Sequence, residues 1–284
     1  MRHCLVAIAI FASATWADDG PVTIKVKQAA VGDVVQESKT EKSVNKIEIS
    51  VNGMEQKKDE SASVSVSYTE EILAKPTGAK KATKIKRVYK SAEMIKDDTK
   101  EDLGLAGKAV LIEKTGDTYK ITADGQELTG TAATILGKEF RKEKQSSDAD
   151  FLPSGPVKVG ATWKIDVSKI AKDASADLDV NVDKSSGTGK LVKVYDKDGR
   201  KFGVLEIKME LALNKIGPAD QSIELKDGAK LDLTLELDLC IDGSSSAATQ
   251  KMTVKGVFSG SAGGADLKFD LTVNSEGSAM EVKK

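Results

Sequence analysis

The sequence predicts a mainly β protein: antiparallel, strongly curved sheets in two β halves, forming a sandwich or half-barrel, with one central amphipathic helix. The strongest observation is the strict alternation of apolar and polar residues over 231–242. Side chains alternate between the two faces of a strand, so one face carries six apolar residues: Leu231, Leu233, Leu235, Leu237, Leu239 and Ile241. A helical period would scatter them, so this segment is a strand with one face in a core and one in water.

Turn signals recur along the chain and give the second observation. Asn-Gly and Asp-Gly pairs tolerate the positive φ angles of tight hairpins. The pairs are Asn52-Gly53, Asp124-Gly125, Asp198-Gly199, Asp227-Gly228 and Asp242-Gly243, and Gly116-Asp117 has the reversed order. Alternating runs flank most of them, for example residues 47–51, 62–68 and 204–213. The sequence therefore predicts a meander of roughly a dozen strands.

Helical periodicity is confined to two segments, which is the third observation. Between residues 129 and 144, one helical side collects apolar side chains: Ala132, Ala133, Ile135, Leu136 and Phe140. This pattern predicts an amphipathic helix at about 130–143, weakened at Gly137. A shorter helix is expected from Ser168, as its N-cap, to Lys172.

The helices also suggest how the chain is divided. We expect an N-terminal β half over 18–145, ending in the helix at about 130–143, and a C-terminal β half over 150–284. One short helix cannot cover a dozen apolar strand faces. The sheets must therefore cover each other or curl closed.

The N-terminus has the pattern of a signal peptide, residues 1–17. A basic start is followed by the apolar run Cys4 to Ala14, and the small residues Thr15 and Ala17 then flank Trp16. Cleavage after Ala14 is the alternative to cleavage after Ala17. The apolar run is too short to span a bilayer, and no later segment is suited to it. The sequence predicts an extracytoplasmic protein, periplasmic or secreted, with no transmembrane anchor after signal removal.

Charge and aromatic content limit the partners. The chain has 43 Lys and Arg against 44 Asp and Glu, and aromatic residues make up 4%. This balance argues against a polyanion partner, and few rings are present to stack on bases, so no nucleic acid is expected. The densest basic stretch is interpreted as protection of an exposed sheet edge; it contains Lys80, Lys81, Lys84, Lys86, Arg87 and Lys90.

Signal removal also limits the chemistry, because His3 and Cys4 leave with it. The mature chain then has no histidine, and Cys240 is its one thiol, which we interpret as half-buried. A Ser–His pair and an internal disulfide are excluded, and a zinc or copper site would need carboxylates alone, which are poor ligands for either metal. We predict no catalytic, cofactor-binding or metal-binding residues and no enzyme activity. An acidic-pair hydrolase is the remote alternative.

The most distinctive local string runs from Phe151 to Ile165. It contains Leu152-Pro-Ser-Gly-Pro-Val-Lys-Val-Gly-Ala-Thr-Trp163. Here the chain resembles uncharacterised exported bacterial β-proteins with a Leu-Pro-x-x-Pro-Val-x-Val-Gly-x-x-Trp motif. The resemblance implies an envelope or secreted protein and no site residues. A looser, fold-level likeness is to curved-sheet carriers of lipoproteins and lipids in the bacterial envelope.

Two functions remain open. The excess of aliphatic strand face over helical cover favours a binder or carrier of an apolar envelope molecule, such as a lipid, lodged between sheet and helix. Its expected ligand-facing residues are Ile135, Leu136, Phe140 and Trp163, with the helix as a movable lid hinged at Gly137 and the linker 145–150. The alternative is a structural or interaction protein that binds an envelope protein, in which Trp163 is a core anchor.

Overall fold

The computed structural model describes residues 20–79, 81–116, 118–140, 148–174, 177–217 and 222–282. The predicted signal peptide, residues 1–17, lies outside these ranges. Within them, no helix has the length and apolar character needed to cross a bilayer.

The described part of the chain is mainly β and antiparallel, as predicted. The strands are β1 Val34–Val51, β2 Met54–Ala74, β3 Lys84–Lys96, β4 Thr99–Asp102, β5 Ala109–Thr115, β6 Thr118–Ala123, β7 Gln126–Glu127, β8 Thr162–Lys164, β9 Leu178–Lys197, β10 Arg200–Ile216, β11 Ile223–Leu225, β12 Lys230–Cys240, β13 Ala248–Ala262 and β14 Ala265–Glu281. The helices are α1 Gly130–Phe140, α2 Val167–Ala174 and the short 3-10 helix η1 Asp148–Phe151.

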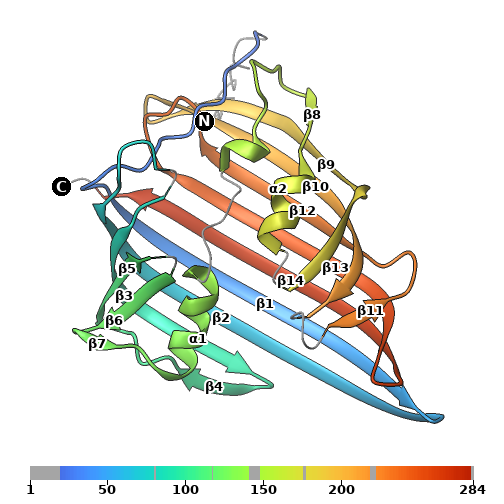
Figure 1. Cartoon of the computed structure of the whole chain (residues 1–284). Helices are drawn as coiled ribbons and strands as arrows, with labels where there is room; N and C mark the ends of the chain where they lie inside the picture. Colours follow the sequence, from blue (N-terminus) through green and yellow to red (C-terminus); the bar gives the residue numbers. More distant parts are fainter. Residues whose placement is uncertain are drawn as a thin grey trace, which may run out of the picture.

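All fourteen strands belong to one curved sheet (Figure 1). The order across it is β7-β6-β5-β3-β2-β1-β14-β13-β11-β10-β9-β8, with β12 paired to β10 and β13, and β4 paired to β3. The middle of the sheet joins early and late sequence, because β1 pairs with β14 from Val35–Glu281 to Ser50–Asp266. The expected division near 145–150 therefore separates two runs of strands within a single sheet.

Helices α1 and α2 lie on the concave side, over different ends of the sheet (Figure 1). The predicted helix at 130–143 is confirmed from Gly130 to Phe140, and residues 141–143 lie outside the described ranges. The shorter helix is also present, but its cap is different. The Oδ1 of Asp166 accepts a hydrogen bond of 3.0 Å from the Ser168 amide, so Asp166 and not Ser168 is the N-cap.

The turn chemistry explains several hairpins directly. Both residues have positive φ at Asn52-Gly53, Asp124-Gly125 and Asp198-Gly199, as a two-residue hairpin requires. Asp97 and Asp98 connect β3 to β4 with φ of 46° and 63°. That turn has no glycine, and the sequence patterns did not identify it.

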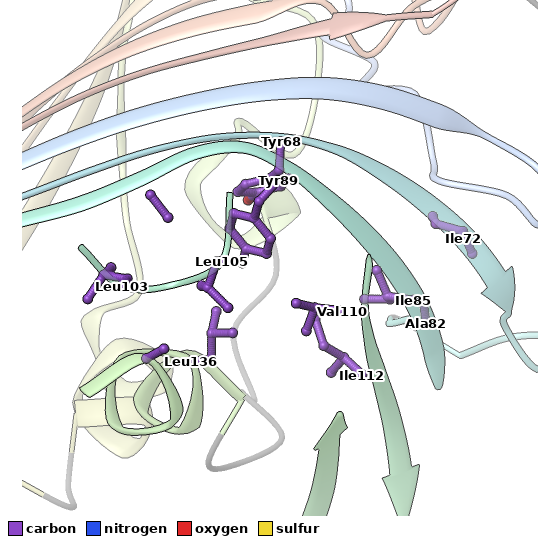
Figure 2. Close-up of a cluster of buried hydrophobic side chains, with 12 residues drawn as sticks. Tyr68, Ile72, Ala82, Ile85, Tyr89, Leu103, Leu105, Val110, Ile112 and Leu136 are labelled. Atoms are coloured by element: carbon purple, nitrogen blue, oxygen red, sulfur yellow. The ribbon is translucent and has the colours of Figure 1, made fainter. Parts of the chain in front are cut away.

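The apolar faces gather into two large cores and a small one. The N-terminal core lies between α1 and the strands β2, β3 and β5; its buried residues include Tyr68, Ile72, Ile85, Tyr89, Leu105, Val110, Ile112, Ala132 and Leu136 (Figure 2). The C-terminal core lies under α2; its buried residues include Ile165, Val167, Ile207, Met209, Leu211, Leu231, Phe258 and Phe269. The small core joins Ile24 to Leu191, Leu205, Leu239 and Ile241.

The basic stretch does not protect an edge, so that interpretation is wrong. β3 lies inside the sheet, with β2 on one side and β5 and β4 on the other. Within it, Arg87 is only 4% exposed, and Lys80 lies outside the described residues. Lys84, Lys86, Arg87 and Lys90 therefore sit on an internal strand, and Arg87 points into the protein.

Candidate functional site

Three of the four predicted ligand-facing residues come together on α1. Leu136 is 4% exposed and reaches into the N-terminal core, while Ile135 and Phe140 are partly buried against it. Figure 2 shows Leu136 directed from the helix toward Leu105, beneath the arch of β2 and β3. The apolar side of α1 is thus mostly packed, and Phe140, at its C-terminal end, is left nearest the surface of this core.

The fourth residue, Trp163, lies in a different part of the molecule. It belongs to β8 and packs against the C-terminal core and the small core. Its ring covers Gly189 so closely that an added Cβ would lie 2.2 Å from a ring carbon. The indole Nε1 donates a 2.9 Å hydrogen bond to the carbonyl oxygen of Phe151. This packing is that of a core anchor, separate from the helix.

The C-terminal end of α1 is fastened to the sheet by Arg87. Its two terminal nitrogens donate to both carboxylate oxygens of Glu139, at 3.0 and 2.7 Å, and its Nε donates to Glu70 at 2.8 Å. The guanidinium also lies over the rings of Tyr68, at 4.3 Å, and Phe140, at 5.0 Å. Two-pronged pairing of this kind fixes geometry as well as charge, so Arg87 acts as a latch between helix and sheet.

The latch extends into a wider polar cluster. The Tyr68 hydroxyl donates a 2.7 Å hydrogen bond to Glu37 of β1. Burial, followed by the neighbouring charge of Glu70, raises the pKa of Glu37 above its ordinary value. Burial alone would lower the pKa of Arg87, but the hydrogen bonds and charge of Glu139 outweigh it, with Tyr68 and Glu70 adding to them, and the pKa is raised. Arg87 therefore stays charged, and Glu37 is protonated more readily than an exposed glutamate.

An open cleft of about 310 Å³ lies beside the latch, at the end of α1. Apolar side chains from the strands β2, β3 and β6 and from α1 form much of its wall, and Tyr119 meets Phe140 there with ring centroids 5.5 Å apart. The lining residues are Ala29, Glu70, Ile72, Lys75, Lys81, Ala82, Ile85, Tyr119, Glu139 and Phe140. The cleft thus combines an aromatic and aliphatic wall with charged groups.

The two carboxylates that share this cleft are Glu70 and Glu139, the arrangement that an acidic-pair hydrolase would need. Such a pair requires room for the substrate and a water between the carboxyl groups. Here the guanidinium of Arg87 bonds to both of them. Within the described ranges, no group of three or more potential metal ligands was found either. Glu70 and Glu139 are thus two carboxylates fastened to one guanidinium.

Sequence reasoning missed Arg87 as the centre of this site, although a signal was present. In β3, Ile85, Arg87 and Tyr89 share one phase of the strand, and the two neighbours are apolar. An arginine in an inward phase must find buried partners. The pattern could therefore have shown that Arg87 is buried, whereas its contact with Glu139, fifty-two positions later, could not be read from it.

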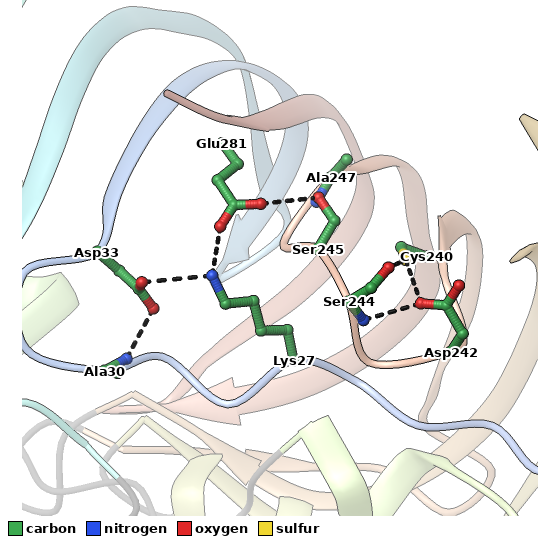
Figure 3. A network of polar contacts seen from close by, with 9 residues as sticks. All are labelled: Lys27, Ala30, Asp33, Cys240, Asp242, Ser244, Ser245, Ala247 and Glu281. Carbon is green, nitrogen blue, oxygen red and sulfur yellow. Dashed lines mark hydrogen bonds and ion pairs between the residues drawn. The ribbon is translucent and has the colours of Figure 1, made fainter. Parts of the chain in front are cut away.

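Cys240 was predicted to be half-buried and is fully buried. Its thiol lies 3.1 Å from Asp242 Oδ1 and 3.5 Å from the Ser244 hydroxyl, and Figure 3 shows the loop that carries both groups. The loop covers the thiol from the side that strand alternation would leave open.

Comparison with known proteins adds little to this geometry. No protein-family model and no curated protein matches the chain. Among solved structures, an outer membrane channel from Pseudomonas putida F1 is similar over 90% of this chain and 97% of that one. The identity is 8% and the TM-score is 0.23, which is too low to support an argument about fold or function.

Proposed function

We propose that the protein is an exported, non-enzymatic binder of an apolar envelope molecule, which it holds in the cleft at the end of α1. The observation that carries the proposal is the cleft itself. At about 310 Å³ it falls in the range of small-molecule sites, which are apolar hollows with a few polar groups. Ile72, Ile85, Tyr119 and Phe140 supply the apolar wall, and lysines at the rim, Lys75 and Lys81, supply charge.

In this proposal only the C-terminal end of α1, and not the whole predicted helix, acts as a lid over the cleft. Ala132 and Leu136 are buried in the N-terminal core, so they fix the first turns of α1. Phe140 and Glu139 lie at the C-terminal end, where the helix depends on the Arg87 latch. Of the predicted hinge, Gly137 lies within the regular helix, and residues 145–147 of the linker lie outside the described ranges. We therefore assign any opening to the last turn of α1.

The test is binding of a neutral apolar dye, N-phenyl-1-naphthylamine, to the mature chain. Phe140→Ala removes one wall of the cleft and should weaken dye binding by about tenfold. Phe151→Ala is the matched control, because Phe151 is also a partly buried phenylalanine but packs against the C-terminal core. Equal dye binding by the wild type and both variants, or no binding at all, would rule out the cleft as a ligand site.

A structural or interaction role is the second candidate, and Trp163 favours it. The ring of Trp163 is packed on Gly189 and its nitrogen is bonded, so it has the setting of a core residue. The leucines of β12 also pack into the cores, which uses the apolar face that first suggested a carrier. If the dye does not bind, capture of an envelope protein by the intact chain is the corresponding test.

A further inference from the structure

A second hollow, of about 330 Å³, lies where the β9–β10 hairpin meets the ends of β12, β13 and β14. The sheet register shows which face its strand residues occupy. Ala279 pairs with Glu37, whose carboxylate bonds to Tyr68 on the concave side. Because neighbouring side chains alternate, Ser278 and Met280 point to the convex side. Ala279 and Glu281, which have the opposite phase, also line the hollow at the end of β14. It shares no lining residue with the cleft beside α1, so the two hollows are distinct.

Two aromatic rings form one wall of the hollow. Tyr195 and Phe202 are stacked, with centroids 5.6 Å apart and an angle of 23° between their planes. The Tyr195 hydroxyl bonds to both carboxylate oxygens of Asp238, at 2.7 and 2.8 Å. Burial and this bond raise the pKa of Tyr195 to about 12, so the hydroxyl remains a donor and the Asp238 charge is satisfied.

A second carboxylate of the hollow, Glu281, is also engaged (Figure 3). One oxygen pairs with the ammonium group of Lys27, and the other accepts a 3.2 Å hydrogen bond from the Ser245 hydroxyl. Ser245 in turn accepts a hydrogen bond from the Ala247 amide, so this side of the hollow is rigidly built. Asp198 remains at the exposed hairpin turn.

Arg200 has no such partner. It lines the hollow and is half-buried, yet within the described ranges it forms no hydrogen bond or ion pair. Its charge lowers the pKa of Glu281 from a distance, as the last of several causes. A guanidinium has five donors in a planar fork, which matches a carboxylate. A half-buried, unpaired arginine beside an apolar wall is a recognition element for an anion with an apolar body.

We infer that this hollow binds an amphiphilic organic monocarboxylate. The carboxylate pairs with Arg200, and the aryl or alkyl body lies across Phe202 and Met280. The inference concerns a different hollow from the proposed α1 cleft and stands independently of it.

The test compares two ligands that differ in charge alone, 1-naphthaleneacetate and its neutral amide, by calorimetric titration of the mature chain. We expect the acid to bind at least about tenfold more tightly than the amide, because only the acid gains the charged hydrogen bonds. Arg200→Gln should reduce the affinity for the acid to that for the amide. Lys208→Gln, a charge loss elsewhere on β10, should leave it unchanged. Equal affinities for acid and amide, or no binding of the acid, would overturn the inference.

A second pair of variants tests the apolar part without disturbing a core. Met280 is 56% exposed at the hollow, and Met54 is 70% exposed at the distant β1–β2 turn. Met280→Glu should weaken binding of the acid by about tenfold or more, and Met54→Glu should not, with both melting like the wild type. If Phe140→Ala abolishes binding of the acid while Met280→Glu preserves it, the ligand occupies the α1 cleft and the inference is wrong.

Discussion

At one end of the sheet, the guanidinium of Arg87 holds α1 over β3. At the other end, α2 and β8 pack closely on β9, which has glycines at the contact positions. Added Cβ atoms at Gly187 and Gly189 would meet Val167 at 3.2 Å and the Trp163 ring at 2.2 Å. Arg87 is the one charged side chain among the described residues that is buried. The N-terminal core is thus fixed by directional charge, and the C-terminal core by close packing.

This difference has physical consequences. Arg87 is buried, so leaving its charge without a partner is costly, whereas the Glu139 side chain is 46% exposed and already reaches water. A ring packed on a glycine leaves no free space at that position, since any added atom must displace the ring. The latch therefore suits the end of the molecule where a ligand is proposed to enter, and the packed end suits a permanent anchor.

The largest expected effect comes from removing the latch. Arg87→Met leaves the mostly buried carboxylate of Glu70 without its partner, while the 46% exposed Glu139 is solvated, and we expect a loss of about 2–4 kcal/mol in the free energy of unfolding. Lys84→Met, on the same strand, breaks only the partly exposed pair with Glu113 and should cost no more than about 1 kcal/mol. Denaturant melts measure both. Similar losses in the two variants would show that the Arg87 cluster is no stronger than a surface pair.

The glycines provide the next contrast. Gly189→Ala forces the Trp163 ring to move and should destabilise the protein by about 1–3 kcal/mol. Gly137→Ala, in α1, meets open space and should stabilise it by up to about 1 kcal/mol, because alanine favours helix. Thermal melts and the fluorescence of Trp163 follow both changes. An unchanged Trp163 spectrum in Gly189→Ala would contradict the close packing.

Two serines test a smaller effect, since each is 2% exposed. Ser245 makes two hydrogen bonds, whereas the hydroxyl of Ser275, in the middle of β14, has no partner within the described ranges. Ser245→Ala should cost about 1–2 kcal/mol, and Ser275→Ala should be neutral or slightly stabilising. A clear loss of stability in Ser275→Ala would mean that its hydroxyl is bonded after all, for example to water.

The smallest effect concerns pH. Because the pKa of Glu37 is raised on folding, its contribution is fully present below the unfolded value of about 4.3 and is lost as the pH rises through the folded pKa. Glu37→Gln keeps an acceptor for Tyr68 and removes this loss, so it should be more stable than the wild type at pH 7, by up to about 1 kcal/mol. The difference should vanish at pH 4. Melts across that range decide it, with Glu101→Gln as an exposed control.

The comparison also shows what the sequence could reveal. Alternation identifies the face of a strand, and the predicted inward leucines of β12 do pack into the cores. The apolar period of α1 likewise predicted Leu136 inside and Phe140 nearby. Alternation cannot identify a strand's partner, because a shift of two residues along any neighbouring strand keeps the same side chains on the same face. The pairing of β1 with β14, the internal position of β3 and the distance between Trp163 and α1 were therefore beyond reach.

That central pairing has a consequence for how the molecule forms. β1 lies between β2 and β14, and β14 is the last strand of the described chain, more than two hundred positions away. A chain emerging from its N-terminus must hold β1 with one side unpaired until β14 arrives, and contacts this distant slow folding. During that interval the open edge can recruit other chains. Deleting β14 should therefore yield an aggregating product rather than a smaller stable one.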